Sequence, residues 1–456
     1  MSRRLLSGLA LMALASCSFD PKFVRPDTTV PTTWPRGESY PEAAAASLPT
    51  VTYQEIFRDL SLQTVIGQAL ANNRDLAIAL ANVAAARSQA HVERGRLFPA
   101  IGVSGGLTAH DEGTSYSANG GLSAFEIDLF GQQRSLSRAA FQEYLASQDA
   151  ERAVRLSLVA EVATAWLTLA ADRTLLAIAV ETEANTLKSV DLTRARLNGG
   201  IAPRSDLRQA ETVLAQARSD HADLTTLVAQ DRNALELLVG APVADALLPA
   251  SIESVDGSLA ELPAGLDSRI LLRRPDVSEA EHALHAANAR IGAARSAFFP
   301  TISLTALAGF ASNSLSSLFS GGNFDWTVSP TASLTLFDGG VKSGNLGVAK
   351  AQRDAAVARY QQAIQAAFRD VADALARRGT IRDQFAAQTD LEAAAADSER
   401  LSTARYREGI DPYLQSLEAQ RTHYSARRSL AATRRVRANN LVELYRSLGG
   451  DQLVGE

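Results

Sequence analysis

The sequence predicts a mainly helical chain that also carries transmembrane β strands and is built from one unit occurring twice. Three observations support this fold class: an internal repeat, long stretches without proline, and segments whose hydrophobic pattern has a period of two. Each unit reads, in order, as helix, β hairpin, long helix, turn and helix. The two halves of the chain are therefore expected to have the same architecture.

The internal repeat appears as matching residues at a nearly constant offset. Residues 73–99 match residues 274–300 at an offset of 201, and both segments end in Phe-Pro. Residues 196–210 match residues 405–419 at an offset of 209. The small increase in offset indicates short insertions after the Phe-Pro dipeptide and in the long helix that follows. The chain is thus one unit duplicated.

Proline placement divides the chain into an extended segment and long helices. Six of the fifteen prolines precede residue 50, which predicts an extended arm there. None lies between Pro99 and Pro203 or between Pro330 and Pro412, so long helices can form without a break. Residues 340–408 also have apolar positions at helical spacing. They predict a helix about 100 Å long, at a rise of about 1.5 Å per residue.

The segments after Pro99 and Pro300 change to a period of two. In residues 326–336 every second side chain is apolar and those between are serine or threonine. The apolar positions are Trp326, Val328, Pro330, Ala332, Leu334 and Leu336. Residues 301–310 repeat this pattern, and residues 101–107 and 122–130 show a weaker form. An apolar outer face and a small-polar inner face are typical of transmembrane β strands.

An edge of a soluble β sandwich would give a similar alternation, and this alternative stays open from the pattern alone. A barrel needs about eight strands, and the sequence supplies four. Oligomerisation is therefore expected to complete the barrel.

The N-terminus has the form of a lipoprotein signal peptide. Arg3 and Arg4 precede an apolar stretch, and Leu-Ala-Ser-Cys ending at Cys17 reads as a lipobox. Cys17 is also the sole cysteine of the chain. The pattern predicts cleavage before Cys17 and lipid attachment to it, the alternative being a small buried side chain in a helix.

Composition excludes several classes of protein. The net charge of -5 gives no positive field for a nucleic acid. No run of about 18 apolar residues follows the N-terminus, so no membrane-spanning helix is expected. No phosphate-binding loop of the ATPase type occurs either. Gly102 to Gly106 fits the esterase string G-x-S-x-G but lies in a predicted strand. His282 and His285 lie on one helix face, and two such histidines are more often packed or exposed than bound to a metal. No catalytic or metal site is therefore predicted.

These observations define the expected domain boundaries. The predicted segments are a signal peptide at 1–16, an extended arm at 17–58, a first repeat at 59–240 with its hairpin at about 100–130, a linker at 241–272, a second repeat at 273–450 with its hairpin at about 301–338, and a C-terminal tail at 451–456.

With these features established, the sequence resembles the TolC-like outer membrane factors, in particular the NodT-type efflux lipoproteins that work with RND pumps. The resemblance covers nearly the whole chain. The residues that carry it are PKFVRP after Cys17, RLFP and AFFP at the ends of the two short helices, FEIDLFG at 125–131, LFDGG at 336–340 and ARYREGIDPYLQSLEAQ at 404–420.

The resemblance implies a homotrimer in the outer membrane, with about twelve strands in one barrel and a helical tube in the periplasm. An equatorial region would draw on the N-terminal arm, residues 241–272 and the C-terminal end. The implied function is a passive duct for small molecules such as drugs and toxic compounds. An inner-membrane RND-type pump would deliver them through a periplasmic adaptor. The implied channel needs no cofactor beyond covalent lipid on Cys17. Two alternatives remain: the outer membrane component of a type I secretion system, and a lipidated periplasmic adaptor.

The resemblance also places a gate at the periplasmic tips, where each long helix turns back. Members of the family close this end with charged and tyrosine side chains. The matching positions are Arg196, Gly200, Arg204, Asp206 and Arg208 in the first unit, and Tyr406, Arg407, Gly409, Asp411, Tyr413 and Glu418 in the second. Gln415 stands where the family often has a carboxylate. We expect arginine–aspartate pairs between the turns, the alternative for each charge being a solvated helix face.

Overall fold

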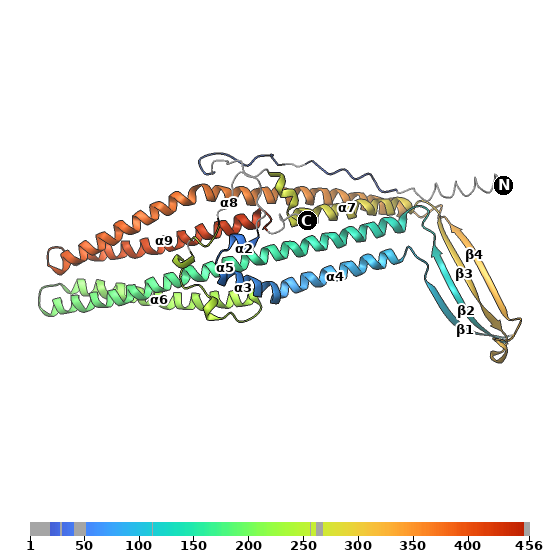
Figure 1. Ribbon diagram of the computed structural model, residues 1–456, viewed down its shortest axis with the longest axis horizontal. Coiled ribbons are helices and arrows are strands. Elements are labelled where there is room, and N and C mark those ends of the chain that lie inside the picture. Colours follow the sequence, from blue (N-terminus) through green and yellow to red (C-terminus); the bar gives the residue numbers. More distant parts are fainter. Residues whose placement is uncertain are drawn as a thin grey trace. The chain divides into compact units, whose positions relative to one another are not determined.

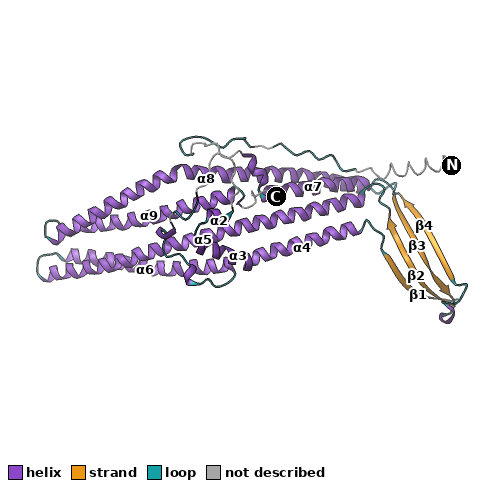
Figure 2. Cartoon of the chain, viewed as in Figure 1, coloured by secondary structure: helices purple, strands orange, loops and turns teal. Residues whose placement is uncertain are grey.

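The computed structural model describes residues 19–27, 30–40, 52–111, 113–255, 257–260 and 268–450. The predicted signal peptide, Cys17 and the C-terminal tail lie outside these residues. The helices are α2 (Tyr53–Ile56), α3 (Leu60–Asn72), α4 (Arg74–Gly95), α5 (Gln132–Asn198), α6 (Arg204–Val239), α7 (Pro275–Ser296), α8 (Val341–Arg407) and α9 (Tyr413–Ser447). The strands are β1 (Ile101–His110), β2 (Gly113–Glu126), β3 (Thr301–Ser312) and β4 (Phe324–Ser333), as Figures 1 and 2 show.

The order of elements repeats as the sequence predicts. A helix, two strands and a pair of long helices occur first as α4 to α6 and again as α7 to α9. The described chain divides into two compact units. Of the described residues, one unit comprises those within 19–27, 80–150 and 278–363, and the other those within 30–79, 151–277 and 364–450. The first unit contains the sheet, and the second contains both turns that join the long helices.

The four strands form one antiparallel sheet in the order β1-β2-β3-β4. Its register brings apolar residues opposite one another: Val328 pairs with Ala306, and Trp326 pairs with Ala308. The intervening pairs, such as Thr305 with Ser329, are polar. Because directly paired residues of antiparallel strands share a face, the alternation predicted strand by strand becomes one continuous apolar face.

That apolar face is open to the surroundings. Val103 is 89% exposed and Trp326 is 66% exposed. On β3, Gly309 has its Cα so close to β2 that an added Cβ would lie 2.2 Å from the carbonyl oxygen of Ala118. A glycine is therefore required where these two strands approach each other.

One boundary of the predicted strands is wrong. Residues 326–336 alternate without a break, but β4 ends at Ser333 and leaves Leu334 and Leu336 outside the sheet. Ser333 pairs with Thr301, the first residue of β3, so no partner strand extends further. The chain then turns at Asp338, whose carboxylate accepts hydrogen bonds from the backbone nitrogens of Gly340 and Lys342, each at 2.9 Å.

In both repeats, the residue just before the first helix makes an equivalent hydrogen bond to the end of the last helix. The Asn73 side chain, just before α4, donates to the carbonyl oxygen of Leu238 at the end of α6, at 2.8 Å. Its counterpart Arg274, just before α7, donates to the carbonyl oxygen of Ser447 at the end of α9, also at 2.8 Å. The donor side chains differ, but the acceptor carbonyls are equivalent, because Leu238 and Ser447 are related by the repeat offset of 209. The duplication thus extends to tertiary contacts.

The N-terminal arm packs along the helices in both units. In the first unit, the Phe19 ring stacks on Phe299 at 4.7 Å, and Phe299 stacks on Phe130 at 4.9 Å. In the second unit, Trp34 stacks on Phe368 of α8 at 5.0 Å. Phe299, which directly precedes Pro300, therefore anchors Phe19, the first described residue of the arm.

One window of α5 is apolar enough to cross a membrane by length and composition, with a mean hydropathy of 1.4. The lengths of the apolar runs in the sequence predict no such segment. The window is 56% buried within the chain. Trp166 of α5 is 1% exposed, and its ring nitrogen donates to the carbonyl oxygen of Leu247 at 3.0 Å. Such burial is typical of a core helix.

Candidate functional site: the tips of the helical hairpins

The two hairpin turns have the same backbone geometry. Gly200 and Gly409 have φ of 73° and 76°, in the left-handed region that glycine adopts without strain. The next nitrogen in each turn, that of Ile201 or Ile410, donates back to the carbonyl oxygen of Arg196 or Arg405, at 3.0 and 2.9 Å. Pro203 and Pro412 then precede the returning helices as N-caps. Glycine stops the first helix and proline starts the second, as the sequence indicates.

A small apolar core lies beneath the turns. It contains Val190, Leu207, Ala210, Leu214, Tyr406, Tyr413 and Leu417. The rings of Tyr406 and Tyr413 are 5.2 Å apart, and these residues are 5% and 1% exposed. Burial raises the pKa of Tyr413 to about 12, with smaller effects from Tyr406 and Asp206. Within the chain, the two predicted gate tyrosines therefore serve as core residues of the tip.

Arg196 joins the two turns. Its guanidinium donates from Nη1 to the carbonyl oxygen of Tyr406 at 2.9 Å and from Nη2 to that of Arg407 at 3.4 Å. It also lies over the Tyr406 ring, with Cζ 4.5 Å from the centroid. A cation on an aromatic face combined with bonds to helix-terminal carbonyls is a favourable arrangement. Arg196 is the predicted site residue that the structure most directly connects to the opposite turn.

The acid of the second turn pairs within its own turn. Asp411 binds Arg405 through two parallel contacts, of 2.5 Å to Nε and 2.9 Å to Nη2. The bonds from Arg405 hold the pKa of the Asp411 carboxyl below its usual range. The expected arginine–aspartate pairing between turns is thus replaced, within one chain, by a pair inside the turn and by the Arg196 contacts to backbone and ring.

The other predicted charged residues lie on the returning helices α6 and α9, except Arg407, which lies at the end of α8. Arg208 of α6 pairs with Glu211 at 2.6 Å, and Arg194 of α5 approaches the same carboxylate at 3.5 Å. The Asp206 charge raises the pKa of Tyr413, which places Asp206 near the tip core. Arg204 begins α6, Arg407 ends α8 and Glu418 lies in α9.

Sequence reasoning did not assign Arg405 to the site. The available signal was the repeat itself, because Arg405 is the counterpart of Arg196 at an offset of 209.

A groove of about 460 Å³ lies between α5, α8 and α9 behind the tip. Its charged lining residues are Glu181, Glu399, Arg400, Arg407, His423 and Arg427. Arg427 pairs with Glu181 of α5 at 2.7 Å, Arg428 with Asp220 of α6 at 3.5 Å, and Arg434 with Glu253 at 2.5 Å. The arginine-rich stretch of α9 thus binds carboxylates within its own chain.

The residues weighed for other chemistry lie in structural positions. Ser104 of the esterase-like string lies within β1. His285 stacks on Phe23 with ring centroids 3.6 Å apart, and His282 Nδ1 lies 2.7 Å from the Gln142 side-chain oxygen. Among the described residues, no group of three or more histidine, cysteine, aspartate or glutamate side chains is arranged to hold a metal ion.

Comparison with known proteins identifies the family. A family model described as outer membrane efflux protein matches residues 65–241 and 266–450. The chain belongs to this family. The two matched segments correspond to the two repeats, so the family match covers both halves of the duplicated architecture.

Curated relatives match over almost their whole length. A probable efflux pump outer membrane protein of Pseudomonas putida, TtgC, is 42% identical over 99% of this chain and 96% of its own length. The cation efflux system protein CusC of Escherichia coli is 37% identical over 98% of this chain and 99% of its own. These relatives are components of efflux systems in the outer membrane or are named for cation efflux.

Solved structures share the fold. A crystal structure of CusC covers 95% of this chain and all of its own, with a TM-score of 0.85 and 36% identity. The open state of the Neisseria gonorrhoeae MtrE outer membrane channel covers 96% of this chain and 99% of its own, with a TM-score of 0.85 and 33% identity. The predicted fold class of outer membrane channels with duplicated helical hairpins is confirmed.

Proposed function

We propose that this chain forms the outer membrane channel of a tripartite efflux system, as a homotrimer that conducts small molecules delivered by an inner-membrane pump through a periplasmic adaptor. The observation that carries the proposal is a sheet with one exposed apolar face, continuous in the chain with helices of 67 residues. Strands that expose an apolar face suit lipid, and helices of this length suit a periplasmic conduit.

The sheet edges support a trimer. Among the described residues, β1 pairs with β2 alone and β4 with β3 alone, so both edges keep free backbone groups. Such edges cannot face hydrocarbon, because each unpaired group would cost several kcal/mol there. Pairing β4 of one chain with β1 of the next closes a barrel of about twelve strands from three chains, above the lower limit of about eight.

The type I secretion and adaptor alternatives are less well supported. Relatives that match 98 to 99% of the chain are named for efflux of toluene, antibiotics or cations. A periplasmic adaptor would expose the apolar face of this four-stranded sheet to water. The different cargoes of these relatives also suit a wide duct whose cargo is chosen by the pump.

The hairpin tips are the proposed gate, and the Arg405–Asp411 pair is the sharpest test of it. We expect Asp411→Asn to loosen the second turn and raise single-channel conductance in planar bilayers at low salt. High salt should raise the conductance of the wild type in the same direction, because exposed pairs are screened within about 8 to 10 Å. Tyr406→Ala is a poorer test, because it would empty the tip core.

Asp191→Asn is the matched control for the gate. Asp191 pairs with Arg194 at 3.5 Å on the exposed surface of α5, before the turn. Its replacement should leave conductance unchanged. Equal conductance of wild type and Asp411→Asn at every salt concentration would place the constriction elsewhere.

Lipid attachment at Cys17 completes the proposal. The lipobox motivates it, and Phe19, two residues further on, is held by the Phe299 and Phe130 stack beside the start of the sheet. Metabolic labelling with palmitate should mark the wild type and leave Cys17→Ala unlabelled. An unlabelled wild type would rule out lipid attachment at Cys17. Conductance by Cys17→Ala would show that the channel conducts without the lipid.

A further inference from the structure

His423 of α9 lies between two carboxylates of α8. Its Nδ1 is 2.5 Å from Glu399 Oε2, and its Nε2 is 3.2 Å from Glu392 Oε1. Glu392 and Glu399 are seven residues apart, so two helical turns place them on the same face of α8. The histidine side chain is 18% exposed, and each glutamate side chain is 29% exposed. Both ring nitrogens are thus engaged in a largely enclosed space.

The protonation state follows from hydrogen-bond chemistry. An ionised carboxylate can only accept, and a neutral imidazole carries one N–H donor. With one proton, the ring would direct a nitrogen lone pair at one of the two carboxylates. With two protons, it donates to both, and both contacts become charge-assisted. While both glutamates are ionised, the imidazolium form is the one that donates to both.

We propose that His423 is a proton-dependent clamp, which joins α9 to both carboxylates of α8 only while its imidazole carries two protons. When the imidazole loses one proton as pH rises, it loses one of its two hydrogen bonds. In place of that bond, a nitrogen lone pair then faces a carboxylate, and the two repel. The contact between α8 and α9 is then strongest at acidic pH and weakens as pH rises. Between about pH 5 and 8 histidine is the side chain that ordinarily changes charge.

The other charged groups around His423 are either charged throughout this pH range or paired with another side chain. The groove residues that face His423 are Glu181 from α5, Arg400 and Arg407 from α8, and Arg427 from α9. The arginines stay charged throughout this range. Glu181 is engaged by Arg427 at 2.7 Å, and Arg400 by Asp397 at 2.6 Å.

The first repeat has an apolar pair where the second has His423 and Glu399. The offset of 209 relates His423 to Leu214 and Glu399 to Val190. Leu214 and Val190 belong to one buried apolar cluster, at 7% and 2% exposure. An apolar contact of α5 with α6 therefore corresponds to an ionic contact of α8 with α9. Glu183, the counterpart of Glu392, contacts Nδ1 of His221 in α6 at 2.8 Å, so the first hairpin has a histidine–carboxylate contact of its own.

The consequence for transport rests on the proposed function, because α8 and α9 carry the second tip turn. A looser second hairpin at higher pH would make the proposed gate easier to open. The clamp itself is tested on the hairpin, so failure of the channel proposal and failure of the clamp give different results.

The test is hydrogen exchange of the full chain in lipid nanodiscs, followed by mass spectrometry of peptides from 385–430. Wild type and His423→Gln are compared at the same pH, so that the intrinsic pH dependence of exchange cancels. At pH 5.5 we expect the wild type to exchange about tenfold more slowly, the effect of losing a hydrogen bond to a charged group. At pH 8.5 the ratio should approach one.

Glu392→Gln is the matched second variant. A glutamine at this position can donate its amide N–H to the unprotonated Nε2, while Nδ1–H still binds Glu399. We therefore expect this variant to keep its protection at both pH values. A His423→Gln effect of equal size at pH 5.5 and 8.5, or a Glu392→Gln chain with the full pH dependence of the wild type, would overturn the clamp.

Discussion

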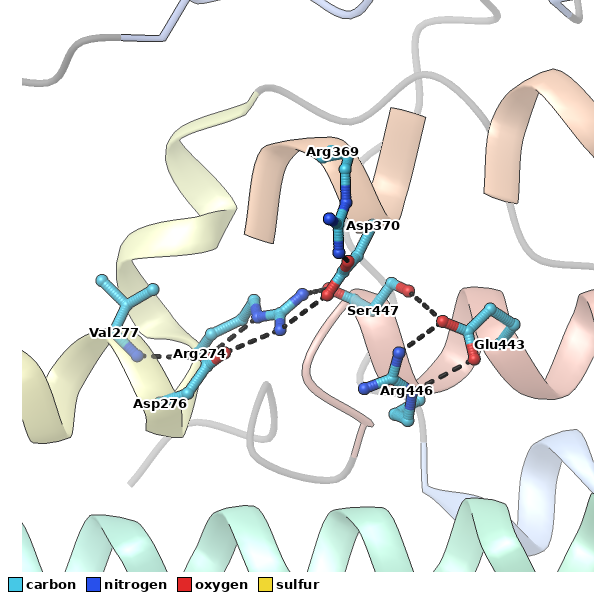
Figure 3. A network of polar contacts seen from close by, with 8 residues as sticks. All are labelled: Arg274, Asp276, Val277, Arg369, Asp370, Glu443, Arg446 and Ser447. Carbon is cyan, nitrogen blue, oxygen red and sulfur yellow. Dashed lines mark hydrogen bonds and ion pairs between the residues drawn. The ribbon is translucent and has the colours of Figure 1, made fainter. Parts of the chain in front are cut away.

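Replacing Arg274 by alanine is expected to lower the free energy of unfolding by about 3 to 5 kcal/mol, the usual cost of removing one partner of a buried ion pair. Figure 3 shows the network around it. Arg274 is 5% exposed and binds Asp276 through Nε at 3.0 Å and Nη2 at 2.7 Å. Its Nη2 also lies 3.5 Å from Asp370 of α8. With the bond to the Ser447 carbonyl, one guanidinium joins the start of α7, the middle of α8 and the end of α9.

The loss is large because two of the remaining groups, the Ser447 carbonyl and Asp370, stay largely buried, whereas the Asp276 side chain is 40% exposed. Without Arg274, the Ser447 carbonyl oxygen loses its side-chain donor, and Asp370, whose side chain is 17% exposed, keeps its charge with fewer partners. Arg274→Lys should recover only part of the stability, since an ammonium cannot reproduce the paired contacts to Asp276.

Arg369→Ala provides the control for this prediction. Arg369 pairs with the same Asp370 at 2.9 Å, but its side chain is 72% exposed. Its replacement should leave stability nearly unchanged. Urea unfolding in detergent, followed by circular dichroism, would compare the three variants. Similar losses for Arg274→Ala and Arg369→Ala would mean that burial of the network does not determine its contribution.

The second large effect is expected on the sheet. Val328→Arg places a charge on the continuous apolar face and should destabilise the assembled protein by about 2 to 4 kcal/mol if this position lies near the bilayer midplane. Thr327→Arg, on the neighbouring residue, turns the charge to the polar face and should be tolerated. Both positions lie within β4, which ends at Ser333.

The measurement is the yield of heat-stable oligomer in outer membrane preparations, after cross-linking in the intact membrane. We expect abundant trimer for Thr327→Arg and little for Val328→Arg. Equal loss from both substitutions would contradict the assignment of faces. Cross-linking of the wild type that gave monomers alone would reject the trimer.

The sequence by itself determined the features that depend on neighbouring residues. Proline-free stretches allowed α5 and α8 to run for 67 residues each, and the Gly and Pro spacing placed both turns. Strict alternation identified the apolar face of β3 and β4. These patterns can be read because helix and strand periods, and the φ preferences of glycine and proline, act within a few residues of the chain.

The tertiary structure alone decided which side chains meet and which are buried. The sequence grouped Tyr406 and Tyr413 with the gate charges, whereas the fold buries both under the turns. It offered Asp411 several arginines, and the turn geometry selected Arg405. The strand pattern continued to Leu336, but β4 stops where β3 begins and no partner remains. The tyrosines are buried by Val190 and Leu207 of the other hairpin, and the end of β4 is set by the first residue of β3. Local periodicity carries no information about which residues come together in three dimensions.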